Sequence, residues 1–131
     1  MILLDTHAAL WLFVRPARLS REASRAIRAA LRDDGMAIAS VSLWELARLA
    51  VTGRIRIQGS LEGLLNQIVG REDVTVLEIT PEIALLAAQF PPTFPGDPVD
   101  RIIGGTARAH GLALVTKDRG MQDSPLLKTV W

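Results

Sequence analysis

The chain contains no cysteine, and this absence excludes several kinds of scaffold and site. Disulfide bonds, a thiol nucleophile and cysteine-bound zinc are all ruled out. The two histidines, His7 and His110, lie far apart in the sequence and cannot by themselves supply a three-histidine zinc site. We therefore expect a reducing, cytoplasmic compartment.

Long hydrophobic runs are missing as well. The longest unbroken apolar run, Ala8 to Val14, falls far short of the roughly 18 residues that a membrane-spanning helix needs. No basic leader precedes the apolar residues after Met1, so we expect mature sequence there and not a signal peptide. The 15 basic and 14 acidic residues nearly cancel, so only the placement of charges can identify a polyanionic partner.

The 131 residues, 49% of them hydrophobic and 22% charged, have the composition of one globular domain over residues 1–131. Four short apolar runs predict buried strands: Ile2 to Leu4, Met36 to Ser40, Val74 to Ile79 and Leu112 to Thr116. Helical stretches separate these runs. The order predicts an α/β fold in which a parallel sheet has helices on both faces.

Residues that commonly begin helices precede most of the helical stretches: Ser20, Ser60, Thr80 before Pro81, and Asp97 before Pro98. Ser42 and Glu45 have the spacing of a capping box. Gly104 and Gly105 fall inside the last long helix, where each glycine is unfavourable by roughly 1 kcal/mol relative to alanine. This pair therefore predicts close packing of that helix against the sheet or a neighbour.

Four acidic residues fall at one edge of the predicted sheet. Asp5 closes the first strand, and Asp118 follows the fourth. Glu45 and Asp100 lie in the first turns of helices that follow the second and third strands. Ligands bind at this edge of open parallel sheets, and like charges 4 Å apart repel by roughly 4 kcal/mol, so we expect a cation there. Oxygen ligands favour Mg²⁺ or Mn²⁺, and such an ion suits phosphodiester hydrolysis.

Each of these acids also has a purely structural interpretation. Asp5 suits a helix cap, Glu45 suits the capping box, Asp100 suits a helix N-terminus, and Asp118 suits a solvated turn. Four independent caps need not share one edge of a sheet. Their joint placement therefore favours the metal site.

Four segments together resemble the PIN-domain ribonucleases of the VapC toxin type. They are LLDTHAALWL at residues 3–12, SVSLWELARL at 40–49, DPVDRII at 97–103 and LVTKD at 114–118. The resemblance implies a PIN-like three-layer α/β/α sandwich with a central parallel sheet of four to five strands. It also implies a Mg²⁺- or Mn²⁺-dependent endoribonuclease that acts as the toxin of a type II toxin–antitoxin pair. The implied partners are an RNA substrate, a cognate VapB-like antitoxin and a second copy of the chain in a homodimer.

By motif position, the resemblance assigns the catalytic and metal-binding roles to Asp5, Glu45, Asp100 and Asp118. It assigns supporting roles to Thr6, Asp97 and Thr116. Asp97 ranks below Asp100, as a supporting residue or a helix cap. Two other functions stay open: a catalytically silent RNA- or protein-binding module of the same fold, and an aspartyl-phosphate phosphatase that uses Asp5 as its nucleophile.

Two further groups of residues allow more than one interpretation. A basic stripe on one helix face suits either RNA phosphates or plain solvent exposure, and it consists of Arg21, Arg25, Arg28 and Arg32. Large apolar residues near the predicted site are expected in the core, with a groove for an antitoxin helix as the alternative; they are Trp11, Phe13, Trp44 and Leu49. Both histidines are expected to be structural.

Overall fold

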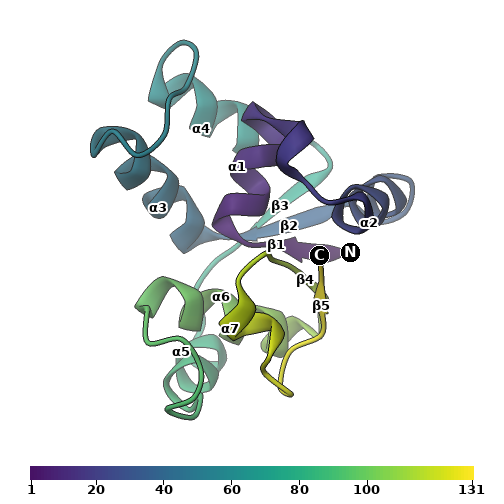
Figure 1. Cartoon of the computed structure of the whole chain (residues 1–131), viewed down its shortest axis with the longest axis vertical. Coiled ribbons are helices and arrows are strands. Elements are labelled where there is room, and N and C mark those ends of the chain that lie inside the picture. Colours follow the sequence, from purple (N-terminus) through teal and green to yellow (C-terminus); the bar gives the residue numbers. More distant parts are fainter.

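One sheet of five parallel strands forms the centre of the molecule, which the computed structural model describes over residues 1–131 (Figure 1). The strands are β1 (Ile2–Leu4), β2 (Met36–Ala39), β3 (Val74–Leu77), β4 (Leu114–Val115) and β5 (Thr129–Val130). Their order across the sheet is β3-β2-β1-β4-β5. The central strands end at nearly the same level, because Leu4 of β1 pairs with Ile38 of β2 and with Val115 of β4.

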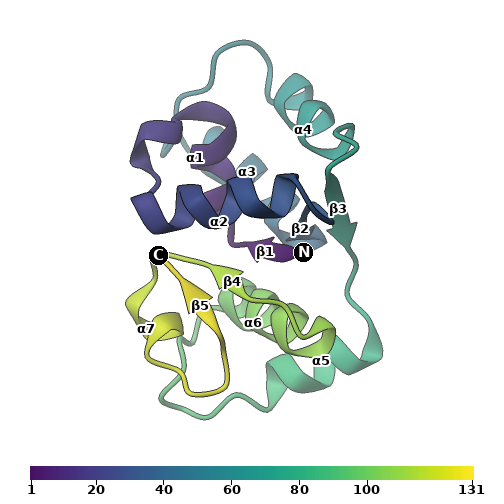
Figure 2. The ribbon, with the colours of Figure 1, turned by 90° about the vertical axis from the view of Figure 1, so that its right-hand side faces the viewer.

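Helices cover both faces of this sheet and complete a three-layer α/β/α sandwich (Figure 2). On one face lie α1 (Thr6–Val14), the 3₁₀ turn η1 (Pro16–Arg18), α2 (Arg21–Leu31), α3 (Ser40–Val51) and α4 (Leu61–Val69). On the other lie α5 (Pro81–Ala88), α6 (Pro98–His110) and α7 (Arg119–Gln122). The predicted parallel α/β architecture is confirmed. None of the helices is long and apolar enough to cross a membrane.

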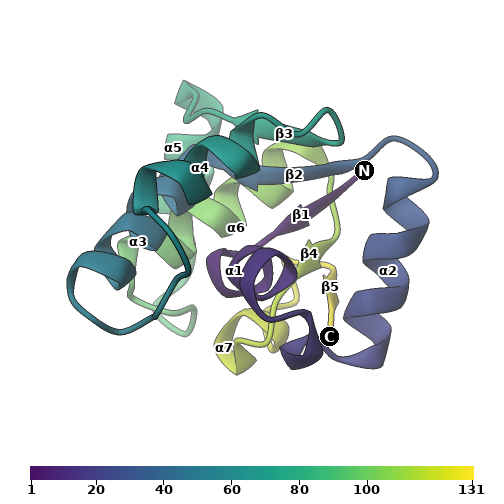
Figure 3. The ribbon, with the colours of Figure 1, turned by 90° about the horizontal axis from the view of Figure 1, so that it is seen from above.

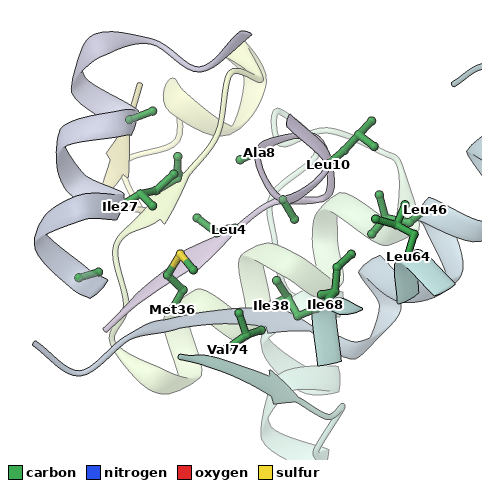
Figure 4. Packing of buried hydrophobic residues seen from close by; sticks show 14 residues of the cluster. Leu4, Ala8, Leu10, Ile27, Met36, Ile38, Leu46, Leu64, Ile68 and Val74 are labelled. Carbon is green, nitrogen blue, oxygen red and sulfur yellow. The ribbon is translucent and has the colours of Figure 1, made fainter. Parts of the chain in front are cut away.

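A separate hydrophobic core lies on each face of the sheet. The larger core joins Leu4 and Ile38 of the central strands to Ile27 of α2 and to Leu64 and Ile68 of α4 (Figure 4). The smaller one lies under α6 and α7 and is built from side chains such as Leu3, Leu114, Ile103 and Met121. Apolar side chains point to both faces of the strands, which explains why the strands read as continuous apolar runs.

Most helix boundaries follow the capping signals in the sequence. The hydroxyl of Ser20 accepts a hydrogen bond from the Ala23 N–H at 3.0 Å, and Ser60 and Thr80 cap α4 and α5 in the same way. The second, third and fourth strands are each shorter than predicted, and the chain adds a fifth strand at its C-terminal end. Strand ends depend on pairing partners, which short apolar runs do not reveal.

The predicted capping box at Ser42 and Glu45 is wrong. α3 begins two residues earlier, at Ser40, after an Ala39 cap whose side chain makes no hydrogen bond. The hydroxyl of Ser42 is fully buried and instead accepts a hydrogen bond from the Thr6 hydroxyl at 3.0 Å. Glu45 therefore lies in the second turn of α3, where it makes no cap and its carboxylate is free for another role.

Gly104 and Gly105 lie in α6 where that helix packs on α5, as the sequence predicts. A Cβ on Gly105 would lie 2.8 Å from the Ile83 carbonyl oxygen and 3.0 Å from the Ala87 nitrogen, both backbone atoms. A Cβ on Gly104 would meet only side-chain ring atoms, with the nearest in Phe90 at 2.8 Å. The two helices therefore approach most closely at Gly105.

We expect Gly105→Ala to lower the free energy of unfolding by about 2 kcal/mol, because α5 must move away to admit the methyl group. The helix propensity of alanine opposes this loss by roughly 1 kcal/mol. Gly104→Ala is the matched control, since a methyl group there meets only the side-chain rings of Phe90 and Phe94 and no backbone atom. Urea unfolding of both variants tests the ranking, and an equal or larger loss at Gly104 would contradict it.

Candidate active site at the carboxyl edge of the sheet

A cavity of about 370 Å³ opens at the carboxyl ends of the central strands. Figures 1 and 3 show α1, α3 and α6 gathered around this end of β1. The acidic residues that line the cavity are Asp5, Glu45, Asp97, Asp100 and Asp118. The structure thus brings together all four acids predicted from the sheet edge, with Asp97 beside them.

Three of these aspartates are also helix N-caps. Oδ1 of Asp5 accepts a hydrogen bond from the Ala8 N–H at 2.7 Å at the start of α1. Oδ1 of Asp118 accepts from the Met121 N–H at 2.8 Å, and Asp97 caps α6 in the same way. Each cap uses a single carboxylate oxygen. A capping role is therefore compatible with binding a ligand through the second oxygen.

The backbone of the sheet holds Asp5 at the floor of the cavity. Its N–H donates to the carbonyl oxygen of Val115 at 3.1 Å and so continues the pairing of β1 with β4. The side chain is buried, at 8% exposure. Asp100 and Glu45 come from helices that pack against each other, α6 and α3, and both are half-buried. The acidic side chains thus come from α3 and from the starts of α1, α6 and α7, four elements that meet at one edge.

Burial and mutual repulsion make these carboxylates reluctant to ionise together. Burial, followed by the negative charges of the neighbouring acids, raises the pKa of Asp100 to about 7. Burial also raises the pKa of Asp5, although hydrogen bonds from the Thr116 hydroxyl and the Ala8 N–H act in the opposite direction. A cation in the cavity would relieve both effects.

The two predicted supporting threonines have different surroundings. The Thr116 hydroxyl accepts from the Asp118 N–H at 3.0 Å and lies near enough to Asp5 to lower the pKa of that carboxyl, so it lies beside two of the acids. Thr6 does not line the cavity, and its hydroxyl donates to Ser42 between α1 and α3. Thr116 therefore lies beside the carboxylates and Thr6 joins α1 to α3, and the supporting roles of both stay predictions.

The donor set suits a hard divalent cation. The cavity offers carboxylate oxygens and a single histidine, His7, with no sulfur ligand. No three of these side chains come close enough together to form a closed ligand cage. Mg²⁺ commonly binds through only one or two carboxylates plus waters, so it does not require such a cage. The residues fit such an ion.

Several other residues at the cavity were not predicted as site residues. Arg54 and Lys117 bring positive charge to its rim, and Trp11 and Leu49, expected in the core, line its wall. Lys117 lies between Thr116 and Asp118 in the sequence, and this position was the one available signal for it. Nothing in the sequence pattern pointed to Arg54.

The predicted basic stripe lies elsewhere. Arg21, Arg25, Arg28 and Arg32 are exposed on or just after α2, and none of them lines the cavity. Figures 1 and 3 both place α2 on the opposite side of the molecule from α3. Trp44 on α3 is 55% exposed, so its predicted core position is also wrong.

Comparison with known proteins places the chain in a family. The model of the PIN domain family matches residues 2–125. The chain is 44% identical over 132 aligned positions to ribonuclease VapC22 of Mycobacterium tuberculosis, covering 99% of this chain and 98% of that one.

Two solved structures share the fold. A crystal structure of VapBC2 from Rickettsia felis, bound to a promoter DNA fragment, matches 98% of this chain and 97% of its own at 14% identity, with a TM-score of 0.72. A toxin–antitoxin complex from Klebsiella pneumoniae matches 97% and 95% at 21% identity, with a TM-score of 0.67. With the family model and the 44% identical relative, these matches show that the chain belongs to the PIN domain family, in its VapC-type branch.

Proposed function

We propose that this chain is a divalent-metal-dependent endoribonuclease and the toxin of a toxin–antitoxin pair. The observation that carries the proposal is the single cavity that Asp5, Glu45, Asp100 and Asp118 line from separate elements. The similarity to ribonuclease VapC22 over nearly the whole chain supports RNA as the substrate. The similarity to the toxin–antitoxin complex from Klebsiella pneumoniae supports a cognate VapB-like antitoxin as partner.

The proposed roles follow from position and charge. Asp5, Asp100 and Asp118 would hold Mg²⁺ or Mn²⁺, and Glu45 would complete the ligand set or orient the attacking water. Such an ion, when bound, supplies positive charge to the phosphate and makes a bound water more acidic. Thr116 would support this arrangement, because its hydroxyl lies beside Asp5 and accepts a hydrogen bond from the Asp118 N–H.

Two basic residues at the rim would complete the substrate site. The Arg54 guanidinium can bind a phosphate through two N–H groups, and the Lys117 ammonium adds a point charge. The Lys117 amine lies 5.7 Å from the centre of the Trp11 ring, which holds it on the same wall as the carboxylates. These cations would draw the phosphodiester toward a cavity that is otherwise negative.

Cleavage of labelled single-stranded RNA by the purified chain tests the proposal. We expect cutting with Mg²⁺ or Mn²⁺ and loss of cutting, by at least about 100-fold, when EDTA is present. Cleavage that persists in EDTA would contradict the metal dependence. Binding without cleavage across a broad panel of RNAs would instead support a silent binding module.

A further inference from the structure

Four arginines, three of them without an assigned role, line a second groove beside the carboxylate cavity. This groove, of about 260 Å³, lies between the end of α1, the turn η1 and the segment that follows α3. Its arginines are Arg15, Arg18, Arg54 and Arg56, and we call it the arginine groove. It shares Trp11 and Arg54 with the carboxylate cavity, so the two hollows adjoin.

Local structure fixes two of these arginines on one side of the chain. Residues 54–57 alternate between exposed and half-buried, and Ile55 and Ile57 pack against the larger core. Because exposed and half-buried residues alternate here, the side chains of Arg54 and Arg56 both lie on the solvent-exposed side of this segment. The segment begins at Gly53, whose φ of 75° allows the Arg54 N–H to return to the Leu49 carbonyl oxygen at 2.9 Å.

The guanidinium groups of this groove have no anionic partner within the chain. The ion pairs of the protein are Met1 with Asp34 and Arg71 with Asp73, both outside the groove. Arg101 offers a contrast, because its guanidinium donates to three backbone carbonyls and so has a structural role. The guanidinium carbon of Arg18 lies 5.2 Å from the centre of the Trp11 ring, and Arg18 has no ion-pair partner. Four adjacent cations without a partner indicate a site for an external polyanion.

We propose that the arginine groove binds the phosphates of the RNA strand next to the phosphate cut in the cavity. This inference rests on the proposed function. A strand held at the carboxylates must leave the cavity, and the groove adjoins it through Arg54 and Trp11. Planar guanidinium groups bind phosphates through paired N–H donors. An acidic peptide would also satisfy the arginines, but the groove adjoins the proposed phosphodiester-cleaving cavity, so a strand that is cut there and continues into the groove favours RNA.

Two triple variants of equal charge test this assignment. The first carries Arg15→Ala, Arg18→Ala and Arg56→Ala, and it leaves Arg54 beside the cavity untouched. The control carries Arg21→Ala, Arg25→Ala and Arg28→Ala on the exposed face of α2. Affinity for labelled single-stranded RNA is measured in EDTA over a series of salt concentrations, so that no cutting interferes. Circular dichroism melting checks folding, and the single variant Arg56→Glu serves if the first triple variant is unstable.

We expect the groove variant to bind RNA at least 10-fold more weakly at about 0.1 M salt. Its slope of log affinity against log salt should be shallower by about 2, since each lost phosphate contact on a single strand contributes roughly 0.7. The α2 variant should stay within about 2-fold of the wild type. Wild-type affinity in the groove variant, or equal losses in both variants, would overturn the proposal.

The design separates this inference from the proposed function. A wild-type chain that binds RNA through the groove but never cuts it would contradict the proposed nuclease activity and leave the groove assignment standing. If the wild type cuts RNA in Mg²⁺ and the groove variant binds RNA with wild-type affinity, only the groove assignment would be overturned. If the groove variant keeps its RNA affinity but loses binding to a poly-glutamate peptide, the groove belongs to a protein partner and our assignment is wrong.

Discussion

Replacing Asp5 with asparagine should reduce RNA cleavage by at least about 100-fold while leaving the fold almost as stable as before. Loss of a supporting residue at a metal site commonly reduces activity by about 10- to 100-fold, and a carboxylate that holds the metal should matter more. Asparagine caps helices as well as aspartate does, so it can keep the bond from the Ala8 N–H. We expect the free energy of unfolding to change by less than about 1 kcal/mol, because burial already disfavours the charge.

The companion variant Asp5→Ala removes both functions of the residue. Losing the cap of α1 should lower the free energy of unfolding by a further 1 kcal/mol or so, at the same low activity. Cleavage rates and urea unfolding of the two variants give the comparison. An asparagine variant that cuts RNA at the wild-type rate would show that Asp5 is a cap and nothing more.

From the sequence, helix capping and ligand binding were alternative roles for these aspartates. The structure makes them compatible for Asp5, Asp97 and Asp118, since each cap bond uses one carboxylate oxygen. Where a strand runs directly into a helix, as β1 runs into α1, the N-cap residue, here Asp5, lies both at the sheet edge and at the helix N-terminus. The same position therefore serves stability and the site.

The fold was largely predictable because its signals are local. Apolar runs identified the strands, and Ser20, Ser60 and Thr80 marked helix starts that depend only on residues three positions away. The capping box failed for the opposite reason. The true partner of Ser42 is Thr6, 36 residues earlier in the chain, and no local pattern reports such a contact.

For the same reason, only part of the candidate site could be predicted from the sequence. The gathering of the acids followed from sheet topology, which brings strand ends to one edge whatever the loops do. The positions of the basic residues could not be predicted from the sheet topology. Amphipathic spacing shows that the α2 arginines face solvent, but it does not show on which side of the molecule they lie. Arg54 reaches the cavity through a glycine turn whose direction only the folded chain reveals.

Asp100→Asn should produce the clearest change with pH. In the folded chain without metal the pKa of Asp100 is about 7, above its ordinary value of 3.8, so folding favours the protonated form. The resulting destabilisation is absent below about pH 4 and fully present above about pH 7. Asparagine removes it, and the variant should gain stability over the wild type as the pH rises through this window. A full shift of this size corresponds to about 4 kcal/mol, and partial exposure to solvent reduces our expectation to about 1–2 kcal/mol.

Mg²⁺ should reverse the order of stability of the wild type and the Asp100→Asn variant at pH 8. Mg²⁺ binds the ionised carboxylates and not the protonated ones, so it should raise the melting temperature of the wild type more than that of Asp100→Asn. Cleavage by the wild type should rise between pH 5 and pH 8 as Asp100 ionises, by up to about 10-fold per pH unit below the pKa. The variant should stay at least about 100-fold less active across the range. Thermal melting with and without Mg²⁺, together with rates at each pH, checks the prediction. Equal stabilisation of both proteins by Mg²⁺ would show that Asp100 does not contribute to ion binding.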